Sequence, residues 1–347
     1  MKDIKNYTLE ELRKLLEKGG CLRFSAQQIF NWIYKRRIED FNLMTDISKQ
    51  TRQFLKDNFY FSRLKLLKRE ISKDKTEKFL FGLEDDSCIE SVLISQVSRL
   101  TLCISTQVGC KFGCKFCLSG KDGFRRNLKV CEITNQYLTV ADLIAPRKIT
   151  NIVFMGIGEP LDNFANTVCA VKIFTHPQGV YFGKRKICLS TCGLVPQIKK
   201  LADLNLGVKL SISLHSPDEA ARSKIMPINK KYPLSELIKA VKDFNKKEKR
   251  HITFEYVLVR GLNTSKVDAQ KLSKLLRGVN YKINLISFNY TCARKGACFE
   301  FKVPTEAEIN SFKNELKKKG VFFTLRKSKG ADINAACGQL RALFKNR

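Results

Sequence analysis

Three cysteines, Cys110, Cys114 and Cys117, lie within eight residues with the spacing C-x3-C-x2-C. Cysteine thiolates are soft ligands that bind zinc or iron–sulfur clusters. A structural zinc ion takes four ligands, commonly as two close pairs, but the next cysteine is Cys131 and the next histidine is His176. Three thiolates can instead bind three irons of a [4Fe-4S] cube and leave the fourth iron open to a substrate. A zinc site with a distant fourth ligand and chance clustering are the alternatives.

This spacing resembles that of the radical S-adenosylmethionine (SAM) enzymes. The resemblance implies that Cys110, Cys114 and Cys117 bind a [4Fe-4S] cluster and that SAM is the second cofactor. The segments around the motif must form the scaffold that positions it.

Short apolar runs typical of β-strands recur from residue 99 onward, with helical patterns such as 194–204 and 234–245 between them. Strands that alternate with helices predict a parallel sheet. Six such units are fewer than the eight of a closed TIM barrel. We therefore predict an α/β fold, an open (β/α)6 partial TIM barrel of the radical SAM kind. The runs are 101–105, 151–155, 186–189, 208–214, 252–259 and 283–287, and 321–325 can add an edge strand.

Polar and glycine-rich segments follow most of these runs. Parallel βα folds carry their chemistry on the loops after the carboxyl ends of the strands. Each loop alone is weak evidence, because glycine pairs are common in turns, a lone histidine is usually structural and Ser-Thr pairs often cap helices. Their shared position predicts an active site at one rim. The segments are the cysteine motif, 156–160, 190–193, 213–216 and 288–290.

The first 60 residues have a helical pattern. Thr8 and Glu11 form a capping box, and leucines follow at helical spacing. Ser25 and Gln28 repeat the box, and a third helix is expected at 46–58. The apolar faces predict a small helical bundle, whose basic outer face can contact an RNA backbone. Its basic residues are Lys35, Arg36, Arg37, Arg52 and Lys56.

A change of period at residue 62 predicts a β-hairpin, in which 78–83 and 89–94 flank an acidic turn. We therefore divide the chain into four parts. These are an N-terminal helical RNA-binding accessory domain (1–60), a β-hairpin linker (61–97), the radical SAM (β/α)6 core (98–330) and a C-terminal tail (331–347).

The chain is strongly basic, with 64 Lys and Arg against 33 Asp and Glu and a net charge of +31. Such an excess attracts polyanions, of which nucleic acid is the first expectation. A lysine-rich surface that reflects genome composition is the alternative, because lysine is spread along most helices. Recurrent basic clusters favour nucleic acid. They lie at 35–37, 184–186, 246–250 and 317–319.

The stretch 1–8 lacks the apolar segment of a signal peptide, and no apolar run reaches the length of a membrane span. We therefore expect a cytoplasmic protein without a membrane partner, whose thiols stay reduced. Cys169 and Cys188 lie in apolar runs and are predicted to be small core residues. The sequence assigns no role to Cys21, Cys88, Cys131, Cys292 and Cys298.

Several further motifs together resemble the RlmN/Cfr family of radical SAM RNA methyltransferases, over residues 7–340. The motif D-I-N-A-A-C-G-Q-L at 332–340 is the most diagnostic, because ordinary radical SAM enzymes lack it. The other motifs are 89–92, 105–110, 123–128, 154–160, 213–217 and 226–229.

The resemblance implies a two-stage methyl transfer to an adenine carbon that is too electron-poor to attack SAM directly. Cys337 first accepts a methyl group from one SAM as a thiolate. A second SAM, reduced at the cluster, gives a 5′-deoxyadenosyl radical that takes hydrogen from the S-methyl group, and the carbon radical adds to the adenine. Glu90 is then the base that removes the ring proton, and Cys103 resolves the adduct through a transient disulfide with Cys337. Without the resemblance, Cys337 and Cys103 would be interpreted as core thiols.

The same resemblance implies a set of SAM contacts. Glu159 suits the methionine ammonium, because a carboxylate there makes a charge-assisted hydrogen bond. The target base must leave its stack to reach the rim, and the basic surface then holds the RNA backbone. The implied contacts are Gly158, Glu159, Ser190, Ser213, Leu214, His215 and Asn289.

Two types of enzyme belong to this family. RlmN-type enzymes methylate carbon 2 of an adenosine in the peptidyl transferase centre of 23S rRNA, and of the adenosine 3′ of certain tRNA anticodons. Cfr-type enzymes methylate carbon 8 of the same rRNA base. Pro160 matches the RlmN type and favours carbon 2. Cys192 and the segment 290–294 depart from the usual pattern, which bears on substrate range rather than on chemistry.

The expected partners are 23S rRNA, tRNA and an electron donor such as flavodoxin, for a monomeric enzyme that uses two SAM per turnover. Two other functions fit parts of the sequence. A radical SAM maturase that acts on a protein has the same cluster motif but leaves Cys337 idle. A zinc-bearing RNA-binding module would have no catalytic activity. The colour of the purified protein distinguishes it, because a zinc protein is colourless and an iron–sulfur protein is brown.

Overall fold

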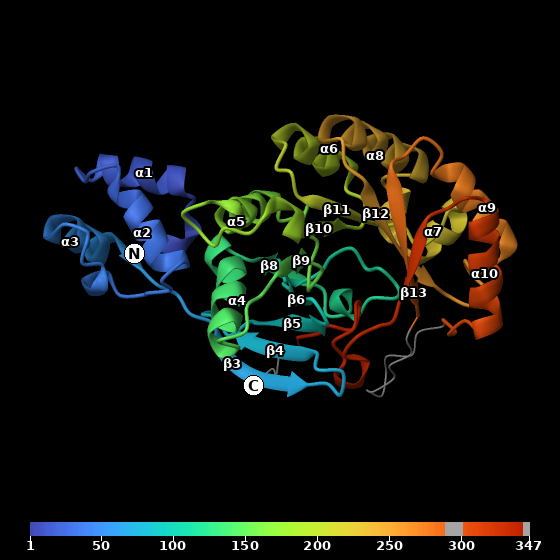
Figure 1. Ribbon diagram of the computed structural model, residues 1–347, viewed down its shortest axis with the longest axis horizontal. Coiled ribbons are helices and arrows are strands. Elements are labelled where there is room, and N and C mark those ends of the chain that lie inside the picture. Colours follow the sequence, from blue (N-terminus) through green and yellow to red (C-terminus); the bar gives the residue numbers. More distant parts are fainter. Residues whose placement is uncertain (289–300, 343–347) are drawn as a thin grey trace.

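A single ten-stranded sheet runs through most of the computed structural model, which describes residues 1–288 and 301–342. Its strand order is β14-β13-β12-β11-β10-β9-β6-β5-β4-β3 (Figure 1). No helix within these residues is both long and apolar enough to cross a membrane. The strands are β3 (Lys65–Ile71), β4 (Glu77–Gly82), β5 (Cys88–Gln96), β6 (Arg99–Cys103), β9 (Asn151–Phe154), β10 (Ile187–Thr191), β11 (Lys209–Ser213), β12 (Ile252–Leu258), β13 (Tyr281–Ser287) and β14 (Phe323–Arg326).

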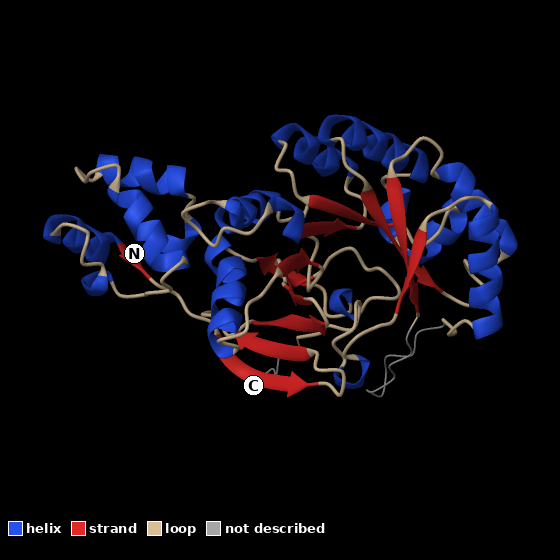
Figure 2. Ribbon diagram, in the orientation of Figure 1, coloured by secondary structure: helices blue, strands red, loops and turns tan. Residues whose placement is uncertain are grey.

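Seven strands of this sheet are mutually parallel, and each pairs with its neighbour in the order β6, β9, β10, β11, β12, β13 and β14. β14 and β3 lie at the two ends of the sheet order, so the barrel is open. This confirms the predicted α/β partial barrel, with the run at 321–325 as its edge strand. Helices cover the outer side of the sheet (Figure 2). They are α4 (Val130–Leu143), α5 (Phe164–Thr175), α6 (Val195–Leu204), α7 (Glu219–Ile225), α8 (Leu234–Glu248), α9 (Lys266–Leu275) and α10 (Glu306–Lys318).

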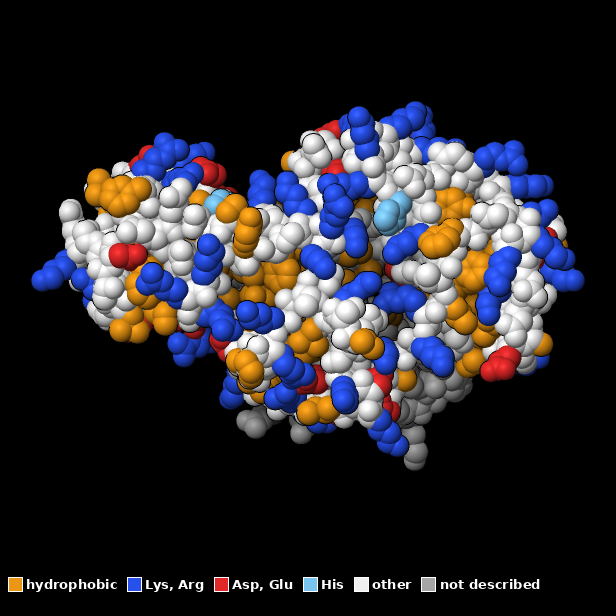
Figure 3. Space-filling view, in the orientation of Figure 1, with side chains coloured by type: hydrophobic (Ala, Val, Ile, Leu, Met, Phe, Trp, Pro, Cys, Tyr) orange, Lys and Arg blue, Asp and Glu red, His pale blue; other side chains and the backbone are white. Residues whose placement is uncertain are grey.

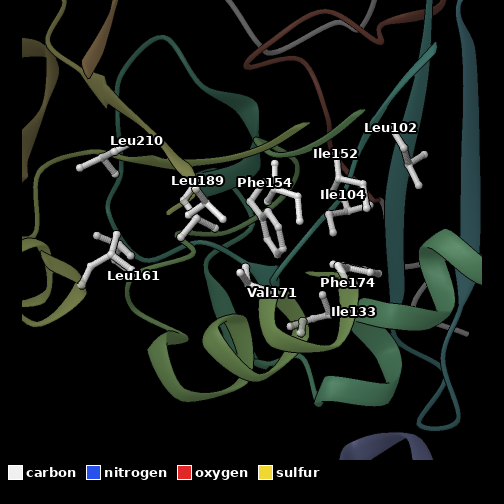
Figure 4. Close-up of a cluster of buried hydrophobic side chains, with 14 of the residues drawn as sticks. Leu102, Ile104, Ile133, Ile152, Phe154, Leu161, Val171, Phe174, Leu189 and Leu210 are labelled. Atoms are coloured by element: carbon white, nitrogen blue, oxygen red, sulfur yellow. The ribbon is translucent and has the colours of Figure 1, made fainter. Parts of the chain in front are cut away.

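Alternate residues of the parallel strands form the outer core. Phe154 and Leu189 belong to the cluster that packs against Val171 and Phe174 of α5 (Figure 4). Successive side chains of a strand point to opposite faces. The residues between these apolar positions therefore face the inside of the half-barrel, and many of them are polar.

The N-terminal helices are α1 (Leu9–Lys18), α2 (Ser25–Tyr34) and α3 (Lys49–Asn58). The Thr8 amide donates to Glu11 Oε2 (2.8 Å) and the Glu11 amide to Thr8 Oγ1 (3.4 Å), so the first capping box is confirmed. The second is wrong. Helix α2 already includes Ser25, which is buried, and its cap residue has no side-chain hydrogen bond. Gln28 Nε2 instead donates to Asp46 O (2.8 Å), and this hydrogen bond ties the loop before α3 to helix α2.

The predicted hairpin is confirmed as β4 and β5, which are antiparallel from Glu77↔Leu93 to Gly82↔Cys88. β5 is also antiparallel to β6, so the hairpin continues the barrel sheet rather than standing apart from it. Strand β3 was not predicted, because its residues are almost all exposed and lack the alternation of a half-buried strand.

Candidate active site

The three cysteines of the motif lie on a loop between two short antiparallel strands, β7 (Gln107–Gly109) and β8 (Phe124–Asn127). The Cys110 amide donates to Gly123 O (2.9 Å), which narrows the base of the loop. Gly109 has a φ of +75°, and a Cβ there would lie 1.9 Å from Gly123 O. The base of the loop therefore requires glycine at position 109. All three cysteines line one open pocket of about 870 Å³.

The same pocket collects residues from five parallel strands, β9 to β13. Leu214 has a fully buried side chain, and its backbone amide donates to Glu255 O (3.1 Å). Asn289 lies outside the described residues, and Glu90 and Cys103 are not among the lining residues. The predicted SAM contacts that line the pocket are Gly158, Glu159, Ser190, Ser213 and His215.

The loop after β9 presents a buried carboxylate to the pocket. Gly158 has a φ of +99°, and a Cβ there would lie 2.5 Å from Gln107 Cβ, so only glycine fits. The Glu159 carboxylate accepts hydrogen bonds from the amides of Leu161 (3.0 Å) and Cys192 (2.8 Å). Burial raises the pKa of Glu159 despite these donors. A cationic ligand group would stabilise its charged form.

His215 is held as a neutral imidazole. Its Nδ1 accepts a hydrogen bond from the Val257 amide (3.0 Å), so the ring proton belongs on Nε2. Burial, together with the nearby Arg222 charge, lowers the pKa of His215 to about 3. The ring packs edge-on against Phe116 of the cysteine loop, with 4.5 Å between centroids. His215 therefore offers one fixed hydrogen-bond donor beside the cysteines.

Arg222 organises the rim, although the sequence analysis did not single it out. Its side chain is fully buried and donates to the carbonyl oxygens of Cys192 (2.9 Å), Ser213 (3.1 Å) and Leu214 (3.1 Å). It also donates to Asn229 Oδ1 (2.5 Å). Burial lowers the pKa of Arg222 to about 10, so it stays charged at neutral pH. The sequence feature that could have indicated Arg222 was the motif 226–229, because it contains Asn229, the hydrogen-bond partner of Arg222.

Replacement of Arg222 by methionine should destabilise the fold by about 3–5 kcal/mol, because it leaves several buried acceptors without a donor. Denaturant unfolding of the reconstituted protein measures this change. The matched control is Arg13→Met on α1, whose side chain forms an ion pair with the exposed Glu10, and we expect less than about 1 kcal/mol there. Equal stability of the two variants would contradict the organising role of Arg222.

The C-terminal tail is tied down on both sides of Cys337. Before it, the Gly330 amide donates to Asp74 Oδ2 (3.0 Å) in the β3–β4 turn. After it, the Leu118 amide, next to the cysteine motif, donates to Gly338 O (2.7 Å). Cys337 is exposed and lines the pocket that the three motif cysteines share. The interpretation of Cys337 as a core thiol is therefore wrong.

Cys103 and Glu90 lie on the side of the pocket that the tail covers. Cys103 is buried on β6 and packs with the tail residue Leu340 in a small apolar cluster. Burial raises the pKa of Cys103, and a charge on Cys337 would raise it further. Glu90 Oε2 accepts a hydrogen bond from the Arg341 amide (2.8 Å). The tail thus brings the three predicted catalytic residues to one region.

An open barrel of parallel strands with a three-cysteine loop at its carboxyl rim defines a radical SAM enzyme. The family model for the radical SAM superfamily matches residues 104–270. The model for the N-terminal domain of ribosomal RNA large subunit methyltransferases matches residues 2–60.

Curated relatives match the chain over nearly its whole length. A probable dual-specificity RNA methyltransferase RlmN from Clostridium novyi is 44% identical over 98% of both chains. The dual-specificity RNA methyltransferase RlmN of Nitratiruptor is 43% identical, also over 98% of both. A crystal structure of a radical SAM methyltransferase from Sphaerobacter thermophilus superimposes with a TM-score of 0.90 at 40% identity, covering 99% of this chain and 100% of that one. The chain belongs to the RlmN family of radical SAM RNA methyltransferases.

The pocket fits the cofactors of this superfamily, a [4Fe-4S] cluster and SAM. Its donor set contains three thiols from one loop, as such a cluster requires. The buried Glu159 carboxylate lines the same pocket and can bind the ammonium group of a methionine moiety.

Proposed function

We propose that this enzyme methylates carbon 2 of an adenosine in the peptidyl transferase centre of 23S rRNA, and of the adenosine 3′ of the anticodon in some tRNAs. The observation that carries the proposal is the Cys337 thiol, which lines the same pocket as Cys110, Cys114 and Cys117. The names of the relatives, which include dual specificity, support two kinds of RNA substrate. Pro160 favours carbon 2 over carbon 8.

We assign Cys110, Cys114 and Cys117 to the cluster. When bound, the cluster supplies the electron that cleaves SAM reductively. Glu159 binds the methionine ammonium, and the Nε2 proton of His215 is available to an acceptor on the same ligand. Two SAM molecules are consumed per turnover, because methylation of Cys337 and reductive cleavage each use one.

The protein residues then act on the methyl group and the adenine in sequence. Cys337 carries the methyl group as a thioether. One hydrogen atom leaves this group for the radical that reductive cleavage of SAM would supply, and the remaining carbon radical forms a bond to the ring carbon. Glu90 removes the proton from that ring carbon. Cys103 attacks the Cys337 sulfur as a thiolate, so that a disulfide forms while the bond from that sulfur to carbon breaks. The released carbon takes up a proton and becomes the methyl group, and the unpaired electron of the adduct leaves to a one-electron acceptor. An external thiol would then reduce the disulfide for the next turnover. All eleven described cysteines are free thiols, and the proposed reaction begins with Cys103 and Cys337 in this reduced state.

Methylation activity should decrease as the pH is lowered. Because Glu90 is the proposed base, the decrease should occur at a higher pH than it would for a glutamate with an ordinary pKa. Burial raises the pKa of Glu90 above 4.5, although Lys78 and the Arg341 amide oppose the rise. The base must be deprotonated, so it is lost as pH falls through this raised pKa. Glu90→Gln should reduce turnover by about 10²–10⁴-fold. Glu70→Gln is the control, because Glu70 contacts the same Lys78 (3.2 Å) but has a lowered pKa. If the loss of activity at low pH is the same in the Glu90→Gln variant as in the wild type, Glu90 is not the base.

The position of methylation tests the proposed function directly. Anaerobically reconstituted enzyme is incubated with isotope-labelled SAM and either a 23S rRNA fragment or a tRNA anticodon stem-loop. Mass spectrometry of the digested nucleosides should show labelled 2-methyladenosine from both RNAs. Only 8-methyladenosine would indicate a Cfr-type enzyme, and label in neither RNA would refute the proposal.

The remaining assignments follow from this chemistry. A one-electron donor such as flavodoxin would reduce the cluster. We propose that the enzyme acts as a monomer. RNA substrates and free thiols both suit the cytoplasm.

A further inference from the structure

Basic residues occupy the amino-terminal end of the parallel strands, on the face that carries the pocket. Residues four apart in a strand point to the same face. Lys209 of β11 is four residues before Ser213, and Lys282 of β13 is four residues before Ile286. Ser213 and Ile286 both line the pocket. The two lysines therefore face the inside of the half-barrel, about 13 Å below the rim at about 3.3 Å per residue.

The neighbouring strands repeat the arrangement. Lys186 ends the 3-10 turn Lys184–Lys186 directly before β10, and its charge acts on Lys209, so it belongs with this group although strand alternation does not apply to it. Arg99, the first residue of β6, is four residues before Cys103. We call Arg99, Lys186, Lys209 and Lys282 the cationic layer.

Electrostatic coupling shows that the members of this layer are close together. The pKa of Lys209 is lowered by partial burial and then by the charges of Lys282, Arg99 and Lys186. The Cys188 thiol pairs with Lys209 across the sheet, and burial raises its pKa to about 12, so it brings no negative charge at neutral pH. Among the described residues, no salt bridge neutralises any of the four cations. An uncompensated group of this kind attracts an anion.

Positive charge also lies along the path from this layer to the thiols. The charge of Arg326 on β14 lowers the pKa of Cys188, Cys103 and Cys337, whereas the Glu255 carboxylate raises the pKa of Cys188 and Cys337. Lys and Arg side chains gather over β10 to β12 in the space-filling view (Figure 3). The positive charge of the half-barrel is therefore concentrated at its lower end, below the pocket, where the carboxylates of Glu255 and Glu159 lie.

We propose that the cationic layer binds phosphate groups of the RNA substrate that flank the target adenosine, while the base itself occupies the rim pocket. The proposal rests on the proposed function and names a surface for its substrate. Contacts to phosphates position a nucleic acid without reading its sequence. One such surface can therefore hold both an rRNA segment and a tRNA anticodon loop, which share a backbone but not a sequence.

Salt-dependent RNA binding tests the layer. The double variant Lys209→Ala/Lys282→Ala is compared with wild-type holoenzyme by fluorescence anisotropy, using a labelled tRNA anticodon stem-loop at several salt concentrations. We expect at least tenfold weaker binding at low salt. The slope of log K against log salt should become shallower by about 1.4–1.8, for two lost phosphate contacts. Lys209→Arg/Lys282→Arg should keep both the affinity and the slope, which shows that charge rather than folding is responsible.

Lys199→Ala/Lys200→Ala is the matched control, because it removes two exposed lysines from α6 on the outer side of the sheet. Its binding should equal that of the wild type. Equal RNA affinity of the layer variant and this control would overturn the proposed phosphate site. Failure of wild-type enzyme to bind or methylate any RNA would instead refute the proposed function, so the two failures are distinguishable. Mass spectrometry of SAM-dependent S-methylation at Cys337 should be unchanged in the layer variant.

Discussion

Cys337→Ala protein should show no RNA methylation, a loss of about 10³-fold or more, because it removes the atom that carries the methyl group. The structure places this thiol on the pocket shared by the three motif cysteines. No other described cysteine lies on the tail. Transfer of radiolabel from SAM to a 23S rRNA fragment measures the loss, and intact-protein mass spectrometry should show that SAM no longer methylates the protein.

Two controls separate a lost carrier from a damaged site. Cys21→Ala changes a half-buried thiol of the N-terminal helical region and should keep full activity. The Cys337→Ala protein itself should keep the brown colour of the cluster and should still cleave SAM reductively with dithionite. Methylation of RNA by the Cys337→Ala enzyme would show that the methyl group does not travel through the tail.

Cys103→Ala protein should trap the RNA covalently on Cys337, because the step that breaks the carbon–sulfur bond has lost its nucleophile. Multiple turnover should fall to a single event per enzyme. The adduct is seen as a band of reduced mobility in denaturing gels, and nuclease digestion followed by peptide mass spectrometry locates the modified nucleoside on Cys337.

Cys188 provides a close comparison for Cys103. Both thiols lie on parallel strands, and burial raises the pKa of each. Cys188→Ala should turn over normally, since Cys188 lacks the contact with the tail cluster that Cys103 has. The double variant Cys103→Ala/Cys337→Ala should form no adduct. Normal multiple turnover by the Cys103→Ala enzyme would assign the resolving step to another group.

Local patterns in the chain were enough to predict most of the elements. Strand and helix periods are local properties, so the apolar runs after residue 99 predicted the parallel strands and the open barrel. The capping box at Thr8 was also correct. Ser25 was not, because the burial of its side chain depends on how α2 packs in the helical region.

The chemistry was partly local as well. The spacing of Cys110, Cys114 and Cys117 indicates a cluster ligand set, because a single loop supplies all three thiols. The tail motif marked Cys337 by resemblance only, and nothing in the residues near it indicated where it would lie.

Tertiary structure alone decided which distant residues meet. Ser119 Oγ donates to Leu340 O across 221 residues, which holds the tail against the cysteine loop. Arg222 became visible as the support of the rim only through its bonds to two separate loops. Lys209 and Lys282 belong to no basic run in the sequence, and strand register brings them together. Such contacts depend on the order and curvature of the sheet, which no short stretch of sequence encodes.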